Sequence, residues 1–290
     1  MSLAERVAKL PFWSQEVEPK PLTGGITNTN FVVAQGDEKF VVRMGHDIPM
    51  HGVMRFNELA ACHAGFACGI SPEVVYTEPG FMIMRFVEGK TLKQEDVIQQ
   101  SYLERILPVI KVCHNEMPKK LRGPILSFWV FHVIRDYAAK LTEDNSRMIP
   151  RLPELLQVSE GLESIVGPIS MVFGHNDLLS ANFIDDGDKI WMIDWDYSGF
   201  TSPLFDLSNL ASNNELTTEQ ERWLLKAYFG KESDDHLWKR YHAMKTASLL
   251  REAMWSMVSE IHSVIDFDYV AYTEENMARY ERALEAFRKL

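Results

Sequence analysis

One polar loop and the hairpin that follows it constrain this chain more than any other part of the sequence. Asp177 and Asn182 lie five residues apart in the loop. A second aspartate, Asp194, follows directly after the strand-like run 189–193. Phosphoryl transfer from a Mg²⁺-bound nucleoside triphosphate needs a carboxylate that orients and deprotonates the attacking hydroxyl, and hard oxygen ligands that hold the metal. The pattern therefore predicts Asp177 as the catalytic base, and Asn182 and Asp194 as the ligands of Mg²⁺.

The spacing of these residues has a mechanical reason. The apolar run before the loop can be a strand. The runs 182–184 and 189–193 flank an Asp-Asp-Gly-Asp turn, which predicts a hairpin. Such a hairpin folds Asp194 back towards Asn182, so that their oxygens converge on one ion. We expect His175, at the start of the loop, to be hydrogen-bonded to backbone and to have no catalytic role.

Composition excludes several classes of protein. The chain has 290 residues, of which 46% are hydrophobic and 24% charged, as in ordinary globular proteins. The net charge of -11 argues against a nucleic-acid partner, because phosphate binding needs a basic surface. No run approaches the length of a transmembrane helix, and the first ten residues lack the apolar core of a signal peptide. Buried free thiols and a cytoplasmic location are expected, because no metal-ligand spacing joins Cys62, Cys68 and Cys113.

Two kinds of pattern divide the chain into lobes. Residues 1–88 are predicted to form a small β-rich, nucleotide-binding lobe, with a helix over 51–65 and strands over 30–34, 39–44, 73–77 and 81–87. From about residue 91 the pattern is helical, and the predicted helices cover 102–117, 128–142, 153–166, 203–212, 218–229, 235–262 and 269–290. We therefore predict an α+β, two-lobed, protein-kinase-like fold, in which residues 89–290 carry catalysis and acceptor binding.

Most of the residues predicted to bind the nucleotide lie in the first lobe. A strand cation paired with a helix glutamate holds the α- and β-phosphates in kinases, and Arg43 and Glu58 stand at such positions. Arginine suits phosphate as a bidentate fork, whereas an outward-facing strand arginine is the alternative. A glycine-rich loop lets backbone N–H groups approach phosphates, and its residues here are Gly24, Gly25, Thr27 and Asn28. At the hinge between the lobes, backbone groups of Phe86 and Val87 would face adenine.

The chain resembles the choline/ethanolamine kinase family, within the wider group of aminoglycoside phosphotransferase-like kinases, over nearly its whole length. The resemblance is carried by the loop at 24–28, by Arg43, which choline kinases also have in place of the protein-kinase lysine, and by the segments 175–182 and 193–197. Protein kinases carry His-Arg-Asp where this chain has His-Asn-Asp. The resemblance implies transfer of the γ-phosphoryl group of ATP to the hydroxyl of choline or a similar amino alcohol, with Mg²⁺ as cofactor.

The resemblance also implies an acceptor site in the C-terminal region. Position by position, the aromatic residues that line the choline site of the family correspond to Tyr197, Trp255 and Tyr272. Two positions depart from the family, because a tryptophan is Glu252 here and a glutamate is Asn213 here. Glu252 and Trp255 also share a face of one predicted helix. Aromatic rings with a carboxylate suit an organic cation, whereas aromatic residues packed between helices are the alternative.

Two further interpretations stay open from the sequence. The first keeps the fold and changes the acceptor to ethanolamine, an aminoglycoside, thiamine or methylthioribose. A polycationic aminoglycoside needs several carboxylates near the acceptor site, and the candidates are Glu260, Asp266, Asp268 and Glu274. The second is a kinase-like binding protein without turnover, which the joint presence of Asp177, Asn182 and Asp194 disfavours. The sequence leaves the oligomeric state and the pathway open.

Overall fold

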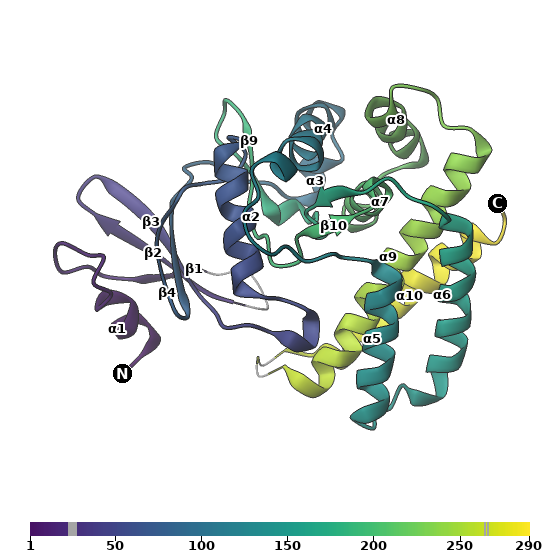
Figure 1. Cartoon of the computed structure of the whole chain (residues 1–290), viewed down its shortest axis with the longest axis horizontal. Coiled ribbons are helices and arrows are strands. Elements are labelled where there is room, and N and C mark those ends of the chain that lie inside the picture. The colour runs from purple at the N-terminus through teal and green to yellow at the C-terminus, as the bar shows by residue number, and fades with distance from the viewer. Residues whose placement is uncertain (23–27, 264, 266) are drawn as a thin grey trace.

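The computed structural model describes residues 1–22, 28–263, 265 and 267–290. A sheet-rich lobe lies at the left of Figure 1 and a helical lobe at the right, which confirms the predicted α+β, two-lobed fold. Four residues named above lie outside the described part of the chain, and these are Gly24, Gly25, Thr27 and Asp266.

An antiparallel sheet with the strand order β1-β2-β3-β5-β4 forms the first lobe. Its strands are β1 (Lys20–Leu22), β2 (Thr29–Gln35), β3 (Glu38–Met44), β4 (Val74–Glu78) and β5 (Phe81–Arg85). Side chains alternate along β3, so Phe40 and Val42 enter a core shared with helix α1 (Leu3–Ala8). Val41 and Arg43 therefore point to the opposite face of the sheet, where a cavity lies between the lobes.

Helix α2 (Arg55–Ala67) lies against β4 and begins four residues later than the predicted helix over 51–65. The 3₁₀ turn η1 (Pro49–His51) ends at Gly52, whose left-handed φ of 70° interrupts a helix. The Asp47 side chain then accepts a hydrogen bond from Arg55 N at 2.7 Å, which caps the new helix. Glu58 consequently lies in the first turn of α2, where it is buried.

Helices form most of the second lobe; the short α3 (Gln94–Val97) was not predicted, and the ends of the other helices differ from the predicted ones by at most three residues. These others are α4 (Gln100–Asn115), α5 (Val130–Glu143), α6 (Leu152–Val166), α7 (Pro203–Asn213), α8 (Thr218–Phe229), α9 (Asp235–His262) and α10 (Tyr269–Phe287). Because α5, α6, α7 and α10 pack around α9, buried residues occupy most of its circumference. Within the described residues, no helix combines the length and apolarity that crossing a bilayer requires.

Short strands at the junction of the lobes shape the predicted catalytic segment. β6 (Lys90–Thr91), β8 (Phe183–Asp185) and β9 (Ile190–Met192) pair in the order β6-β8-β9, and β7 (Val172–Gly174) pairs with β10 (Gly199–Thr201). The hairpin predicted before Asp194 is confirmed as β8 and β9. The predicted boundary between residues 88 and 89 falls just before β6, and the division into 1–88 and 89–290 stays a prediction.

Helix α1 was not predicted from the periodicity of apolar residues, although a capping box marks its start. Ser2 Oγ accepts a hydrogen bond from Glu5 N at 3.2 Å, and Ser2 N donates to Glu5 Oε2 at 2.7 Å. The strands β1, β6 and β10 were also not predicted, because runs of two or three residues are too short to show alternation.

Two helical glycines give a matched test of how tightly a helix packs against its surroundings. A Cβ on Gly65 would lie 2.7 Å from the Cβ of Ser71, whereas a Cβ on Gly161 would meet nothing within 4 Å. We expect Gly65→Ala to lower the free energy of unfolding by about 1–3 kcal/mol through overpacking. Gly161→Ala should raise it by up to about 1 kcal/mol through helix propensity. Urea unfolding of both variants measures the two changes, and equal stability of the two variants would contradict the packing argument.

Candidate active site

The loop that carries Asp177 is held by the first turns of α7. Asp206 accepts hydrogen bonds from the backbone N–H groups of His175 and Asn176, each at 2.8 Å. Asn209 Oδ1 accepts a third from the backbone N–H that follows Asp177, at 2.6 Å. These bonds fix the backbone on both sides of Asp177 and satisfy buried donors. The direction of the Asp177 side chain is therefore set by α7 as well as by its own loop.

Asp206 performs this task as a carboxylate. It is fully buried, and burial alone would raise its pKa, but His114 and the backbone donors outweigh burial and lower the pKa below its usual range. His114 Nε2 lies 3.0 Å from Asp206 Oδ2. On the other side of the loop, His175 Nε2 lies 2.8 Å from the Ile193 carbonyl oxygen, which confirms His175 as a backbone-bonded loop histidine.

Asp177 lines a cavity of about 440 Å³ between the lobes. Its carboxylate makes no hydrogen bond with the described residues. Burial raises the pKa of Asp177 to about 8, although the Arg251 guanidinium acts in the opposite direction, and the carboxylates of Glu252 and Asp194 raise the pKa further. An aspartate with this pKa can accept a proton near neutral pH, which is the property required of a general base.

The β8–β9 pairing brings the predicted metal ligands together. Asn182 lies opposite Ile193, whose N–H donates to the Asn182 carbonyl at 3.0 Å, and Asp194 is the next residue. Asn182 Nδ2 donates to the Asp177 carbonyl at 2.8 Å, which leaves Asn182 Oδ1 as the side-chain atom that a metal can use. Asn182 and Asp194 both line the same cavity as Asp177.

These two residues fit a Mg²⁺ ion that is shared with a nucleotide. Mg²⁺ usually takes one or two protein oxygens together with phosphates and water. In the described ranges, no cluster of three or more His, Cys, Asp or Glu side chains is arranged to hold a metal without such help. Burial would raise the pKa of Asp194, but the adjacent Arg43 outweighs it and lowers the pKa, so Asp194 is ionised as a metal ligand must be.

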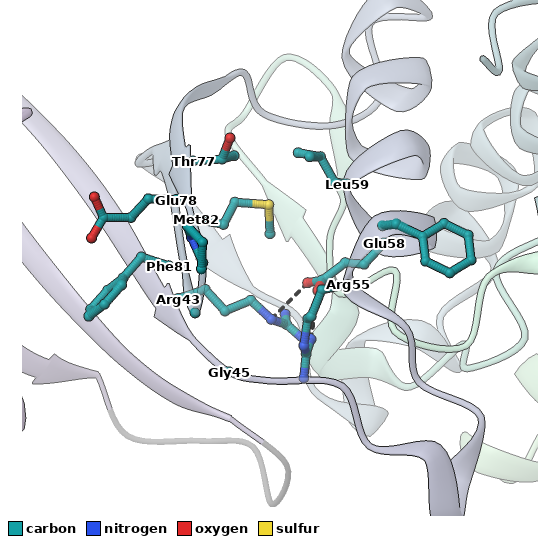
Figure 2. A pocket seen from close by; sticks show the side chains of 12 residues that line it. Arg43, Gly45, Arg55, Glu58, Leu59, Thr77, Glu78, Phe81 and Met82 are labelled. Atoms are coloured by element: carbon teal, nitrogen blue, oxygen red, sulfur yellow. Dashed lines mark hydrogen bonds and ion pairs between the residues drawn. The ribbon is translucent and has the colours of Figure 1, made fainter. Parts of the chain in front are cut away.

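The ion pair predicted between Arg43 and Glu58 is present. Arg43 Nε lies 2.8 Å from Glu58 Oε1, and Figure 2 shows the two side chains meeting between β3 and α2. Arg43 Nη2 also lies 2.8 Å from Asp194 Oδ1 and 2.6 Å from Asp196 Oδ1. With an exposed fraction of 7%, Arg43 is not an outward-facing strand arginine, so that alternative is wrong. Carboxylates from both lobes thus surround its guanidinium, and its contact with phosphate stays a prediction.

A second cavity of about 400 Å³ opens beside the ion pair, between α2 and the turn that joins β4 to β5. Figure 2 shows Leu59, Phe81 and Met82 around this cavity, with Arg43, Arg55 and Glu58 at one side. The predicted catalytic and metal-binding residues line the larger cavity instead.

Of the remaining predicted nucleotide residues, the described ones line the larger cavity. Phe86 and Val87 line it, and Phe86 N donates to the Lys39 carbonyl at 3.0 Å, so this N–H is already used by the sheet. Asn28, at the end of the glycine-rich loop, donates from Nδ2 to Asp196 Oδ2 at 2.9 Å. Nucleotide contacts by Phe86, Val87 and Asn28 stay predictions.

The predicted acceptor residues line this same cavity and bond to one another. Trp255 Nε1 donates to the Tyr197 hydroxyl at 2.7 Å, and the Tyr272 hydroxyl donates to Glu252 Oε1 at 3.1 Å. The rings of Trp255 and Tyr272 are nearly perpendicular, at 87°, with centroids 6.4 Å apart. Trp255 is only 4% exposed and its ring lies 4.9 Å from the His51 ring, so it packs between elements as well as lining the cavity.

Other charged residues of this site were not predicted. Arg55 lies three residues before Glu58, and this helical spacing was the signal that could have found it. Asp196 follows Asp194 by two residues and shares Arg43 with it. Arg251 is 2% exposed, and its Nη1 lies 3.0 Å from Glu252 Oε2. An arginine adjacent to an acidic residue carries no signal of burial, so Arg251 could not be found from sequence.

Of the carboxylates considered for an aminoglycoside, the three that the structure describes do not gather at this cavity. Glu260 pairs with Arg147 at 2.8 Å and 2.9 Å, and Asp268 caps α10 by accepting a hydrogen bond from Ala271 N at 2.9 Å. Neither they nor Glu274 lines the cavity. The described candidates therefore supply no acidic surface for an aminoglycoside at this cavity.

Comparisons with known proteins agree with this arrangement. A family model described as choline/ethanolamine kinase matches residues 20–223. Protein LicA of Haemophilus influenzae is 27% identical over 271 residues, with 89% of this chain and 78% of that protein covered. Ethanolamine kinase 2 of Homo sapiens is 26% identical over 303 residues, with 93% and 77% covered. The crystal structure of a choline/ethanolamine kinase family protein from Mesorhizobium loti superposes with a TM-score of 0.77 at 25% identity, with 97% and 93% covered.

The raised pKa of Asp177 has a consequence for stability. Between the unfolded pKa of about 4 and the folded pKa of about 8, the folded chain retains a proton that the unfolded chain loses, so the free energy of unfolding falls as pH rises through this window. Asp177→Asn removes this dependence. Its gain in the free energy of unfolding over the unchanged chain should therefore be larger at pH 8 than at pH 5, as measured by urea unfolding.

A matched variant controls for the loss of a charge. Asp37→Asn removes an exposed carboxylate from the turn between β2 and β3 and should show no such growth with pH. If the gain of Asp177→Asn were the same at both pH values, the raised pKa of Asp177 would be refuted.

Proposed function

Because the chain belongs to the choline/ethanolamine kinase family, it is an ATP-dependent phosphotransferase that acts on an alcohol group, and we propose that Asp177 directs the transfer to the hydroxyl of choline. The single observation that carries this proposal is one cavity lined both by the residues that we assign to phosphate transfer and by aromatic residues. Asp177, Asn182 and Asp194 line it together with Trp255 and Tyr272.

In this proposal Asp177 orients the acceptor hydroxyl and takes up its proton. The acceptor oxygen forms a bond to the γ-phosphorus, while the bond from that phosphorus to the β,γ-bridging oxygen breaks and ADP leaves with the electron pair. The pKa of about 8 supports this role, because the carboxylate can hold the proton at neutral pH and release it to solvent afterwards.

The charges of the nucleotide are met by residues from both lobes. We assign Asn182 Oδ1 and Asp194 to hold Mg²⁺, which when bound neutralises phosphate charge and orients the leaving group. Arg43, oriented by Glu58, is assigned to the α- and β-phosphates. Gly24, Gly25, Thr27 and Asn28 are assigned to the phosphates, and Phe86 and Val87 to adenine.

Tyr197, Trp255, Tyr272 and Glu252 are assigned to the acceptor ammonium group. Glu252 already carries the Arg251 ion pair and the Tyr272 hydrogen bond, so few of its lone pairs remain for a primary ammonium with three N–H donors. A trimethylammonium group needs no such acceptors and is attracted by ring faces, at about 0.5–2 kcal/mol each. This balance favours choline over ethanolamine.

The assignment of the base is tested by two variants. Asp177→Asn should keep nucleotide binding and lower kcat by about 10²–10⁴-fold, because the base is lost while the metal ligands remain. Asp194→Ala should instead lose Mg²⁺-dependent nucleotide binding. ADP release and ATP titration measure the two effects, and normal turnover by Asp177→Asn would show that another group is the base. A chain that binds ATP but releases no ADP with any amino alcohol would be a binding protein without turnover.

The acceptor assignment is tested with choline and ethanolamine as substrates. Trp255→Ala should lower kcat/KM for choline by about tenfold while leaving the KM for ATP unchanged, because a ring face is lost. Glu252→Gln should weaken both amines. Trp223→Phe, on α8 and away from the cavity, is the control. A preference for ethanolamine or an aminoglycoside, together with unchanged choline turnover in Trp255→Phe, would reduce Trp255 to a packing residue.

A further inference from the structure

Arg55 completes a closed ring of alternating charges with Arg43. Arg43 Nε lies 2.8 Å from Glu58 Oε1, and Arg55 Nη1 lies 2.6 Å from Glu58 Oε2. The second carboxylate is Asp196, whose Oδ1 lies 2.7 Å from Arg55 Nη1 and 2.6 Å from Arg43 Nη2. Figure 2 shows the two guanidinium groups converging on Glu58. Because Glu58 and Arg55 come from α2 and Asp196 from the other lobe, the ring joins the lobes.

The ring divides buried negative charge between two cations. Glu58 and Asp196 are 2% and 4% exposed, so each needs a counter-ion within the protein. Asp194 adds a third carboxylate on Arg43 alone. Without Arg55, the single guanidinium of Arg43 would face all three carboxylates. Arg43 would then be held more strongly by the protein and be less able to exchange a carboxylate for a phosphate.

Every nitrogen of the Arg55 side chain already has a partner in the protein, and four of its five N–H groups are accounted for. Nη1 is shared by the two carboxylates of the ring, Nη2 donates to Asn28 Oδ1 at 2.7 Å, and Nε donates to the His46 carbonyl at 2.9 Å. Its contact with Asn28 extends the ring to the end of the glycine-rich loop. Arg55 also does not line the larger cavity, where Asp177, Asn182 and Asp194 lie, so the contacts point to a role through other residues.

The chain leaves space for this arrangement at Gly45. A Cβ at that position would lie 2.9 Å from Arg55 Nη2 and 2.7 Å from Asn28 Oδ1. Gly45 does not have a positive φ, so its lack of a side chain is explained by the close passage of Arg55 and not by its backbone conformation. The glycine is an observation independent of the charges, and it points to the same contact.

We propose that Arg55 is a positioning residue for nucleotide binding, which holds Glu58 and Asp196 so that Arg43 can exchange Asp194 for the phosphates of ATP. This proposal rests on the proposed function, since it takes ATP as the nucleotide. It assigns Arg55 a role through Arg43 and predicts that the two arginines are not independent.

The test is the affinity for Mg²⁺-ATP, measured by calorimetric titration without acceptor. Arg55→Met should weaken ATP binding by at least about tenfold, because Arg43 is then retained by the carboxylates. Arg55→Lys keeps the charge, but one ammonium with three N–H donors cannot replace the contacts of Arg55 with four partners, so its ATP affinity should fall in between. The double variant Arg43→Ala/Arg55→Met should bind ATP as Arg43→Ala does, because Arg55 acts through Arg43.

Further variants keep the test decisive. Gly45→Ala changes no charge but crowds both Arg55 and its partner Asn28, and it should weaken ATP binding in the same direction, which matters if Arg55→Met does not fold. Arg135→Met breaks the exposed Arg135–Glu163 pair on α5 and α6 and should leave ATP affinity unchanged. Thermal unfolding of each ligand-free variant separates loss of fold from loss of affinity.

Several outcomes would overturn the proposal. Unchanged ATP affinity in folded Arg55→Met and Gly45→Ala would reduce Arg55 to a structural residue. Additive losses in the double variant would mean that Arg55 acts independently of Arg43. Failure of the unchanged chain to bind ATP would instead contradict the proposed function, so the two failures are distinguishable.

Discussion

The structure depends on the carboxylates at the junction of the two lobes. These carboxylates differ in the hydrogen-bond donors and positive charges that surround them. Asp206 is balanced by His114 and by backbone N–H groups, which makes it a fixed acceptor for the catalytic loop. Glu58 and Asp196 are balanced by guanidinium groups. Asp177 has no hydrogen-bond partner among the described residues, and burial raises its pKa to about 8. The least compensated carboxylate is thus the one assigned to take up a proton.

Two of the four described non-glycine residues with a positive φ lie at the same junction. Asn176 and Asp194 have φ values of 65° and 68°, which non-glycine residues rarely adopt. Each is restrained by its neighbourhood, since Asn176 N donates to Asp206 and the residue before Asp194 bonds to both Asn182 and His175. The chain therefore turns sharply next to the proposed base and at the proposed metal ligand. Strain of this kind persists only where surrounding bonds determine the conformation, as they do here.

Two kinds of feature could be predicted from the sequence: helices, whose apolar residues recur at a regular period, and motifs, whose residues stand at fixed spacings. The helices of the second lobe have apolar faces long enough to read, and the Asp177–Asn182–Asp194 spacing needs only a loop and a hairpin. Residues whose partners lie far away in the sequence could not be predicted from periodicity or from motif spacing. Arg55 and Asp196 meet across 141 positions in the sequence, and α2 began late because Gly52 adopts a left-handed conformation. The capping box of α1 was readable, but its helix is too short for periodicity to show.

At the proposed acceptor site, Glu252 stands where the family carries an aromatic residue, and it forms a charged pair with Arg251. Arg251 is buried, pairs with Glu252, and lies 5.2 Å from the ring centroid of Tyr197, so one face of that ring already meets a cation. One face of Trp255 is likewise covered by His51. What remains for an ammonium group is the corner between the perpendicular rings of Trp255 and Tyr272. In such a corner the apolar surface of the ammonium group matters more than its hydrogen-bond donors, because the nearest carboxylate is already occupied on both oxygens.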